Sequence, residues 1–195
     1  MTWLAIIPLK GLGQRKTRLA SRLDEDERRR LSDALFNHVA DVLAACPDIS
    51  EVALLSHAQP EAWTGRFFPD GGSGLNAELD QVSTALAPRP LLVIHADLPL
   101  IRPDDVAALL DATTSGVAIA ADRRDSGTNA LALRDPAGFR FAFGIDSLAR
   151  HREAANGLAR VVTRPGLSLD IDTPEDLDAA IALGFSWPAP VSPPR

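Results

Sequence analysis

Three aspartates occupy positions where carboxylates could bind a metal ion. Asp97 lies two residues after the predicted buried strand 91–95, while Asp170 and Asp172 are alternate residues of a later extended stretch. Because alternate side chains of an extended chain share a face, Asp170 and Asp172 are expected to point to the same side. A carboxylate beside buried apolar chain is costly unless it is solvated, paired or bound to a cation. Carboxylate oxygens are ligands that Mg²⁺ prefers, so the three acids predict a magnesium site.

Two of these acids also have a purely structural interpretation. Asp97 precedes a Leu-Pro pair, so it could be a turn residue or a helix cap. Asp172 precedes Thr-Pro-Glu-Asp at 173–176, a good helix start in which Asp172 could simply support the helix terminus. Asp170 has no comparable structural explanation.

The chain's two lysines fall in one short loop. Of 20 basic residues, 18 are Arg, and Lys10 and Lys16 both lie in the segment 8–19, PLKGLGQRKTRL, together with Arg15 and Arg18. A compact ammonium suits a site that meets a phosphate, and glycines let backbone amides approach an anion. The spacing matches neither a P-loop nor a dinucleotide fingerprint. A solvated loop in an Arg-biased chain is the structural alternative.

Composition excludes several classes of protein. The net charge of -6 argues against nucleic acid as the main partner, since backbone binding needs clustered cations. No apolar run approaches the ~20 residues of a membrane helix, so no membrane partner is expected. The apolar start of the chain lacks a basic leader and a cleavage site. Cys46, the single cysteine, lies on an apolar helical position and is interpreted as a buried thiol. These features predict a cytoplasmic protein.

Strand-like and helix-like segments alternate along the whole chain. This alternation predicts an α/β fold with a mostly parallel central sheet and helices on both faces. We expect one domain over residues 1–185 and a mobile, Pro-rich tail over 186–195. Strands are expected at 3–9, 51–56, 91–95, 117–121, 130–133, 159–163 and 167–171. Helices are expected up to residue 46 (opened by the acids 24–27, with an apolar stripe over 31–46), at 75–86, from 103, at 145–155 and from 174.

The expected fold predicts that the three acids and the basic loop lie at the same edge of the sheet. Ligands of such sheets bind at the carboxyl ends of the strands. The basic loop follows the first strand, Asp97 follows the third, and Asp170 and Asp172 end a late one. Cations and a metal would offset the repulsion when a phosphate oxygen attacks a nucleoside triphosphate. That reaction needs no general base, and no nucleophile–base pair is evident. His38 and His95 are interpreted as structural, and His57 is uninformative.

Three further stretches that contain glycine could be ligand loops or ordinary turns. Residues 71–76, GGSGLN, precede a helix, so their amides could face an anion. Residues 125–129 and 143–147 offer hydroxyls and glycine amides suited to a carboxylate or phosphate. Turn chemistry and helix capping would explain these residues equally well.

Read together, these stretches resemble the 2-phospho-L-lactate guanylyltransferases, a family that includes phosphoenolpyruvate guanylyltransferases of coenzyme F-420 biosynthesis. The likeness runs in the family's order from residue 6 to about 178, and the Gly-Thr-Asn-Ala-Leu and Phe-Gly-x-x-Ser-x-x-x-His motifs are its most specific part. The matching pieces are Ile7-Pro8-Leu9-Lys10, Lys16-Thr17-Arg18-Leu19, Gly74-Leu75-Asn76, Ala96-Asp97-Leu98-Pro99, Gly127-Thr128-Asn129-Ala130-Leu131, Phe143-Gly144 with Ser147 and His151, and Leu169-Asp170-Ile171-Asp172-Thr173-Pro174.

The resemblance implies a three-layer, Rossmann-like nucleotidyltransferase fold (GT-A-like), similar to that of molybdenum-cofactor guanylyltransferase, and a role for each motif. Two magnesium ions would be held by Asp97, Asp170 and Asp172. The catalytic residues would be Lys10, Lys16 and Asp97. The acceptor's carboxylate would be held at Thr128, Gly144 and Ser147, and His151 is left with at most an orienting role beside Ser147. The GTP site would comprise Pro8, Leu9, Lys10, Lys16, Arg18, Gly74 and Asn76.

The expected reaction is transfer of GMP from GTP to a small phosphorylated acid, with release of pyrophosphate. 2-Phospholactate, phosphoenolpyruvate and 3-phosphoglycerate remain open as acceptors. Hand-off of a labile product to a downstream transferase and a homodimer are further expectations. The alternatives are a molybdenum-cofactor or other small-molecule nucleotidyltransferase, a glycosyltransferase that uses Asp170 and Asp172, and a non-catalytic nucleotide-binding module. Pro8-Leu9-Lys10 replaces the superfamily's glycine-rich loop, which points away from the molybdenum enzyme.

Overall fold

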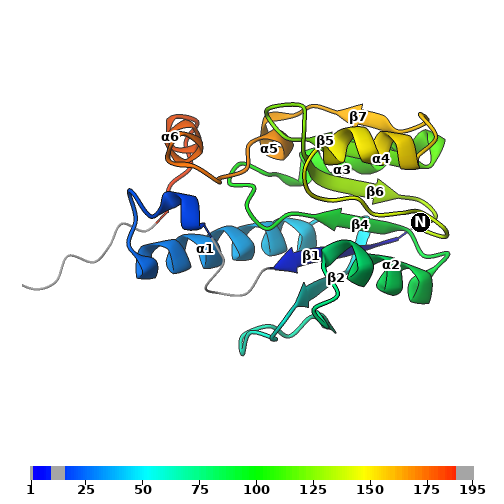
Figure 1. Ribbon diagram of the computed structural model, residues 1–195, viewed down its shortest axis with the longest axis horizontal. Helices are drawn as coiled ribbons and strands as arrows, with labels where there is room; N and C mark the ends of the chain where they lie inside the picture. The colour runs from blue at the N-terminus through cyan, green and yellow to red at the C-terminus, as the bar shows by residue number, and fades with distance from the viewer. Residues whose placement is uncertain (1, 10–15, 188–195) are drawn as a thin grey trace, which may run out of the picture.

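A seven-stranded sheet forms the centre of the molecule, which a computed structural model describes over residues 2–9 and 16–187 (Figure 1). The strands lie side by side in the order β3-β2-β1-β4-β6-β5-β7. Their bounds are β1 Trp3–Leu9, β2 Ile49–Ser56, β3 Arg66–Pro69, β4 Leu91–Ile94, β5 Val117–Ala121, β6 Thr128–Leu133 and β7 Arg160–Val162.

One strand of the sheet runs against all the others. β6 pairs antiparallel with both β4 and β5, whereas the remaining pairs are parallel. The start of β6 therefore lies at the edge where its neighbours end, and Ala121 at the end of β5 pairs with Thr128. The expected α/β fold with a mostly parallel sheet is confirmed.

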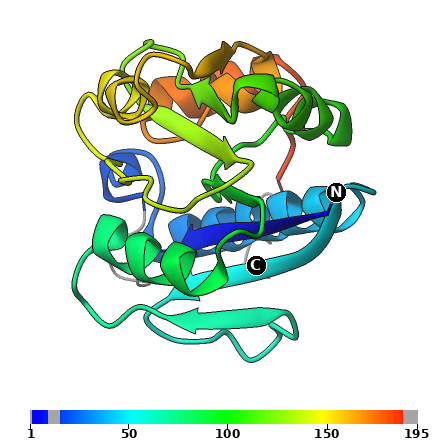
Figure 2. The ribbon, with the colours of Figure 1, turned by 90° about the vertical axis from the view of Figure 1, so that its right-hand side faces the viewer.

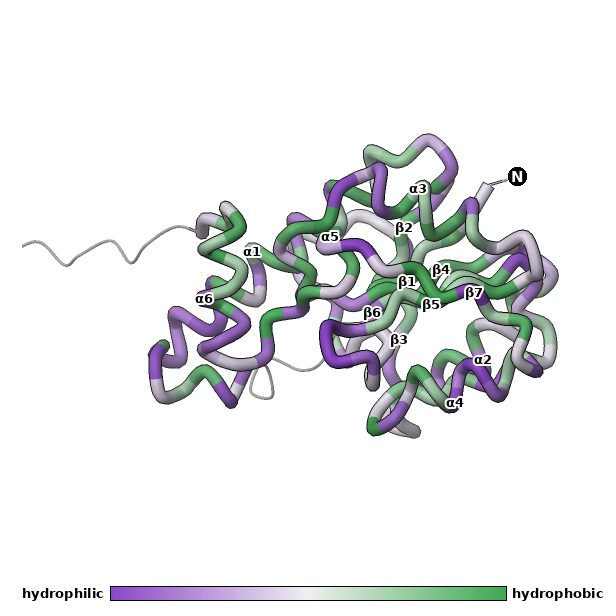
Figure 3. The backbone as a smooth tube through the Cα atoms, turned by 90° about the horizontal axis from the view of Figure 1, so that it is seen from above, coloured by the Kyte–Doolittle hydropathy of each residue, from purple (hydrophilic) through white to green (hydrophobic). Residues whose placement is uncertain are grey.

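Helices cover both faces of the sheet (Figures 2 and 3). α1 and α3 contribute to the core on one face, where they meet side chains such as Ala5 and Ile7. α2 and α4 contribute to the core on the other face, with Leu4 and Ile6. The helices are η2 Thr17–Leu19, α1 Glu25–Ala44, α2 Leu75–Leu86, α3 Pro103–Asp111, η3 Thr113–Ser115, α4 Ser147–Ala154, α5 Pro165–Ser168 and α6 Pro174–Ala182.

A third apolar cluster lies beyond the sheet, where α6 and η2 pack near α1 (Figure 1). Leu19, Leu169 and Ile171 are all buried in it. Because the stretch around Ile171 is extended, its apolar residues enter the cluster while the intervening Asp170 and Asp172 face the other way. The cluster therefore fixes the segment that follows Lys16 and the segment that carries both acids.

Most of the expected elements are present, with two corrections. β1, α2 and β5 have the expected bounds, and Cys46 is buried as expected. The sequence predicts a loop where β3 lies, because this four-residue strand has exposed ends and two adjacent, partly buried phenylalanines and so shows no alternation. The expected strand at 167–171 is wrong: Pro165 starts the short helix α5, and an irregular extended segment follows. Of the expected tail at 186–195, the structure describes only 186 and 187, and Trp187 packs on the third cluster.

Candidate active site

A cleft of about 530 Å³ opens at the edge of the sheet where the parallel strands end. It is lined by residues from β1, η2, the loop after β4, the start of β6, the start of α4 and the segment before α6. Most of the sequence-predicted site residues line it, namely Pro8, Leu9, Lys16, Arg18, Asp97, Thr128, Gly144, Ser147, Asp170 and Asp172. Lys10, the other predicted lysine, lies outside the described residues.

Three carboxylates converge in this cleft. One oxygen each of Asp97, Asp170 and Asp172 lies within 4.8 Å of the others. The backbone N–H of Ile171 donates to the carbonyl oxygen of Asp97 at 3.1 Å and so ties the loop after β4 to the segment before α6. Asp97 and Asp170 are partly buried, and half of the Asp172 side chain is exposed. This geometry resembles the hard-oxygen ligand set that Mg²⁺ takes.

Lys16 places a positive charge among the acids. Its Nζ lies 2.7 Å from Asp97 Oδ2 and 3.3 Å from Asp172 Oδ1. Only 8% of the side chain is exposed. Burial by itself would lower the pKa of the Lys16 ammonium, but the two carboxylates outweigh it and raise the pKa above its ordinary value. Lys16 is therefore a permanent cation at neutral pH.

The pKa values of Asp97 and Asp170 shift in opposite directions. Burial raises the pKa of Asp170 to about 6, and the charges of Asp97 and Asp172 add to the rise. Burial also disfavours ionisation of Asp97, yet Lys16 and His95 outweigh it and lower the Asp97 pKa. One lysine thus leaves the three acids incompletely neutralised.

The donor set fits a divalent cation. Asp97 Oδ1 is buried and accepts no hydrogen bond from any described residue, which is costly for a charged oxygen. The mutual repulsion that raises the Asp170 pKa is the second sign of missing positive charge. A bound Mg²⁺ would satisfy both groups.

Asp172 is free of the capping role that its sequence context offered. Thr173 is the N-cap of α6, and Asp176 completes the capping box. The carboxylate of Asp176 accepts from the backbone N–H groups of Thr173 and Asp172 at 2.9 and 3.2 Å. Asp176 therefore satisfies the helix terminus, and the carboxylate of Asp172 remains for the cleft.

The predicted acceptor residues Thr128, Gly144 and Ser147 also line the cleft and form what we call its acceptor wall. Thr128 starts β6, and Ser147 starts α4; both are almost fully buried. Gly144 has φ +123°, a conformation that favours glycine, and a Cβ there would meet no atom within 4 Å. The wall therefore offers two hydroxyls beside a helix N-terminus, groups that suit an anion.

Three predicted residues lie behind this wall or beside it. Gly74 is the N-cap of α2, and neither it nor Asn76 lines the cleft, although Leu75 between them does. The Asn76 side chain donates to the carbonyl of Phe143 at 3.0 Å and accepts from its N–H at 2.7 Å. His151 was expected to orient Ser147, but its two ring nitrogens lie 3.0 Å from Thr128 Oγ1 and 3.0 Å from the Ala142 nitrogen.

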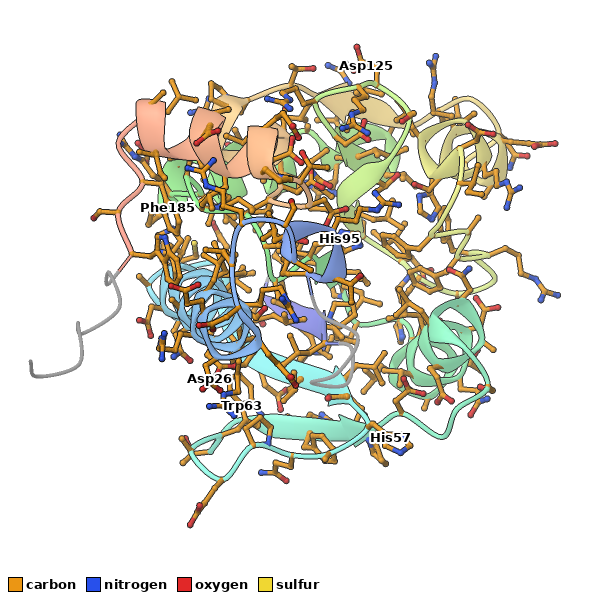
Figure 4. All side chains as sticks on the ribbon, turned by 60° about the vertical axis from the view of Figure 1, so that its left-hand side comes forward. Asp26, His57, Trp63, His95, Asp125 and Phe185 are labelled. Carbon is orange, nitrogen blue, oxygen red and sulfur yellow. The ribbon has the colours of Figure 1, made fainter. Side chains whose placement is uncertain are left out.

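Sequence reasoning missed several residues of the site. Asn129 donates to Asp170 Oδ1 at 3.3 Å and to the carbonyls of Leu167 and Ser168. Its place directly after Thr128 in the family motif was the available signal. His95, expected to be structural, lines the cleft near the centre of the molecule, whereas His57 lies by the edge strands (Figure 4). Asp122 also lines it and accepts from backbone N–H groups of its own turn.

Comparison with solved structures supports the fold. A protein from Desulfovibrio desulfuricans G20, assigned to the nucleotide-diphospho-sugar transferases, has a TM-score of 0.73 at 17% identity, with 92% of this chain and 86% of that chain covered. A 4-diphosphocytidyl-2C-methyl-D-erythritol synthase from Anaerococcus prevotii DSM 20548 has a TM-score of 0.58 at 15% identity, covering 93% and 95%. At these identities the likeness concerns the fold alone.

Comparison of the sequence identifies the family. The family model described as "Guanylyl transferase CofC like" matches residues 3–185. The chain belongs to this guanylyltransferase family. The expected class of enzyme, a nucleotidyltransferase that moves a guanylyl group, is thereby confirmed, and the metal-dependent glycosyltransferase and the non-catalytic module are set aside.

Curated relatives of this guanylyltransferase match over nearly their whole length. A phosphoenolpyruvate guanylyltransferase of Sphaerobacter thermophilus is 40% identical over 191 residues, covering 91% of this chain and 92% of the relative. Proteins of the same name from Nocardia farcinica and Streptomyces coelicolor are 36% and 32% identical and cover 92% and 94% of this chain, and 85% and 92% of their own. Within the described part of the enzyme, no helix is both long and apolar enough to cross a membrane.

Proposed function

We propose that this enzyme transfers GMP from GTP to phosphoenolpyruvate in a Mg²⁺-dependent reaction of coenzyme F-420 biosynthesis. The observation that supports it best is the convergence of three carboxylates with Lys16 in one cleft that Thr128 and Ser147 also line. The name shared by the curated relatives favours phosphoenolpyruvate over the other two phospho-acids.

The proposed reaction joins two anions. An oxygen of the acceptor's phosphate attacks the α-phosphorus of GTP, a new P–O bond forms, the bond between the α- and β-phosphates breaks, and pyrophosphate leaves. The phosphate oxygen is already a nucleophile, so no side chain needs to remove a proton. The enzyme's task is therefore to hold the partners in line and to offset negative charge.

Asp97, Asp170 and Asp172 would hold Mg²⁺, in the proposal as two ions. When bound, magnesium would neutralise phosphate oxygens and stabilise the charge that develops on the leaving pyrophosphate. Lys16 and Arg18 line the same cleft, so their cations would lie near the triphosphate. Lys10, which directly follows Leu9 in the sequence, is proposed to join them.

Thr128, Gly144 and Ser147 would bind the acceptor. Their two hydroxyls and the N-terminus of α4 offer hydrogen-bond donors to the carboxylate of phosphoenolpyruvate. Thr128 and Ser147 are not among the three carboxylates, so single substitutions of these hydroxyls should weaken acceptor binding more than metal binding. We place the reaction in the cytoplasm, where GTP is supplied, with the labile product passed to a downstream transferase.

Pyrophosphate release tests the proposal directly. Phosphoenolpyruvate, 2-phospholactate and 3-phosphoglycerate are each offered with GTP, ATP, CTP and UTP, with Mg²⁺ or with EDTA. We expect the fastest release with GTP, phosphoenolpyruvate and Mg²⁺, and none with EDTA. Release with another base or acid would correct the specificity. Absence of release with all three acids would refute the proposed function.

A further inference from the structure

His151 lies in the core directly behind the acceptor wall. The side chain is fully buried and does not line the cleft. The Phe143 ring packs edge-on against the imidazole with centroids 4.7 Å apart, and the Phe139 ring lies 6.1 Å away. A buried imidazole among aromatic rings must satisfy both ring nitrogens locally.

The hydrogen bonds of His151 determine where its proton lies. The backbone N–H of Ala142 points to Nε2 at 3.0 Å, and a backbone N–H can only donate, so Nε2 accepts and carries no proton. In the neutral ring the proton is then on Nδ1, which lies 3.0 Å from Thr128 Oγ1. Burial, with a smaller effect of His95, lowers the pKa of His151 to about 4, so the ring is neutral at pH 7.

This tautomer determines whether the Thr128 hydroxyl accepts or donates the hydrogen bond with His151. A threonine oxygen can accept two hydrogen bonds but has a single proton to donate. Because Oγ1 accepts from His151 Nδ1–H, the hydroxyl proton remains available. Thr128 lines the cleft, and across residues 2–9 and 16–187 His151 is the only recorded partner of its hydroxyl.

We propose that His151 is a positioning residue that fixes the Thr128 hydroxyl as a donor into the cleft, toward an anionic oxygen of the acceptor. The inference rests on the proposed function and adds to it the residue that orients the acceptor subsite.

The same imidazole links the two halves of the acceptor wall. Nδ1 binds Thr128 at the start of β6, and Nε2 binds Ala142, two residues before Gly144. Asn76 holds the intervening Phe143 backbone from the other side. Replacement of the imidazole should therefore move Thr128 and the Gly144 segment together, while Lys16 and the three acids keep their contacts.

The kinetic test compares His151→Phe with Phe139→Leu. The first variant keeps a ring of similar size but removes both nitrogens, and the second removes aromatic packing against His151 but leaves its hydrogen bonds in place. We expect His151→Phe to raise the phosphoenolpyruvate KM by about 10- to 100-fold with the GTP KM unchanged, the usual effect of losing a hydrogen bond to an anion. Phe139→Leu should leave the phosphoenolpyruvate KM near that of the wild type.

A double-mutant cycle tests the link to Thr128. Because both single changes act on the same oriented donor, the loss of acceptor binding in His151→Phe combined with Thr128→Val should be smaller than the sum of the two single losses. Fully additive effects, or equal losses in His151→Phe and Phe139→Leu, would overturn the positioning role and leave only a packing role.

A measurement on the wild-type protein is independent of turnover. ¹⁵N NMR of the histidine rings, with His151 assigned by comparison with a variant, should show Nδ1 protonated and Nε2 unprotonated at pH 7. The opposite tautomer or a cationic ring would overturn the inference. If the tautomer is as expected but no phospho-acid reacts, the failure belongs to the proposed function.

Discussion

At the scale of single residues, the raised pKa of Asp170 reflects its burial and the excess of negative charge in the site. Its pKa rises from 3.8 to about 6, first through burial and then through Asp97 and Asp172. A raised carboxyl pKa means that the folded protein binds the proton more tightly than the unfolded chain. Ionised Asp170 therefore destabilises the metal-free fold, and stability is lost as pH rises from about 4 to about 6.

The change Asp170→Asn should consequently stabilise the protein in EDTA at pH 8. Asparagine keeps the size of the side chain but removes the repulsion with Asp97 and Asp172. We expect the Tm to rise by a few degrees at pH 8, with little difference from the wild type at pH 4.5, where Asp170 is protonated. Thermal unfolding followed by circular dichroism checks this. A lower Tm at pH 8 would mean that the hydrogen bond from Asn129 matters more than the repulsion.

At the scale of elements, the acceptor wall depends on the segment between β6 and α4. Gly144 has φ +123°, so an added Cβ strains the backbone although the surrounding space is open. Gly138, in the same segment, has φ +72° and equally open surroundings, but it does not line the cleft. The two glycines therefore form a matched pair.

We expect Gly144→Ala and Gly138→Ala to cost similar stability, about 1–3 kcal/mol each, because both force alanine into a left-handed conformation. Only Gly144→Ala should raise the KM for phosphoenolpyruvate, since only Gly144 lies at the proposed subsite. Urea unfolding and steady-state kinetics separate the two effects. An equal rise in KM for both variants would remove Gly144 from the subsite.

At the scale of the whole molecule, the cleft is lined by parts of the chain that pack in different apolar clusters. The third apolar cluster holds the segments around Lys16, Asp170 and Asp172, while β6 and α4 carry the acceptor wall. A ligand that bridges these parts stabilises the folded state by mass action.

We therefore expect Mg²⁺ with GTP at about 100 times its Kd to add about 2.7 kcal/mol and to raise the Tm by about 5–10 °C. Asp97→Asn should abolish this shift and lower turnover by at least about 100-fold, because the amide cannot replace an anionic metal ligand. Asp125→Asn is the control, since Asp125 is exposed and asparagine tolerates its left-handed conformation. A full thermal shift with Asp97→Asn would contradict the assigned metal site.

Residue spacing alone was enough to predict several secondary-structure elements and the shared face of two acids. Apolar periodicity located β1, α2 and β5, the two-residue spacing placed Asp170 and Asp172 on one face, and Thr173 with Asp176 marked the start of α6. These signals are local, because they depend on residues within one or two turns of chain. The family motifs added the acceptor residues, which periodicity could not distinguish from turn chemistry.

Which distant groups contact one another depends on the tertiary packing. Lys16 and Asp97 are 81 residues apart, and their contact depends on the third apolar cluster and on the hydrogen bond between Ile171 and Asp97. The direction of β6 brings Thr128 to the edge where β4 and β5 end, and His151 then reaches it from α4. Strand order and direction follow from how the layers pack, and residue spacing carries no record of that packing.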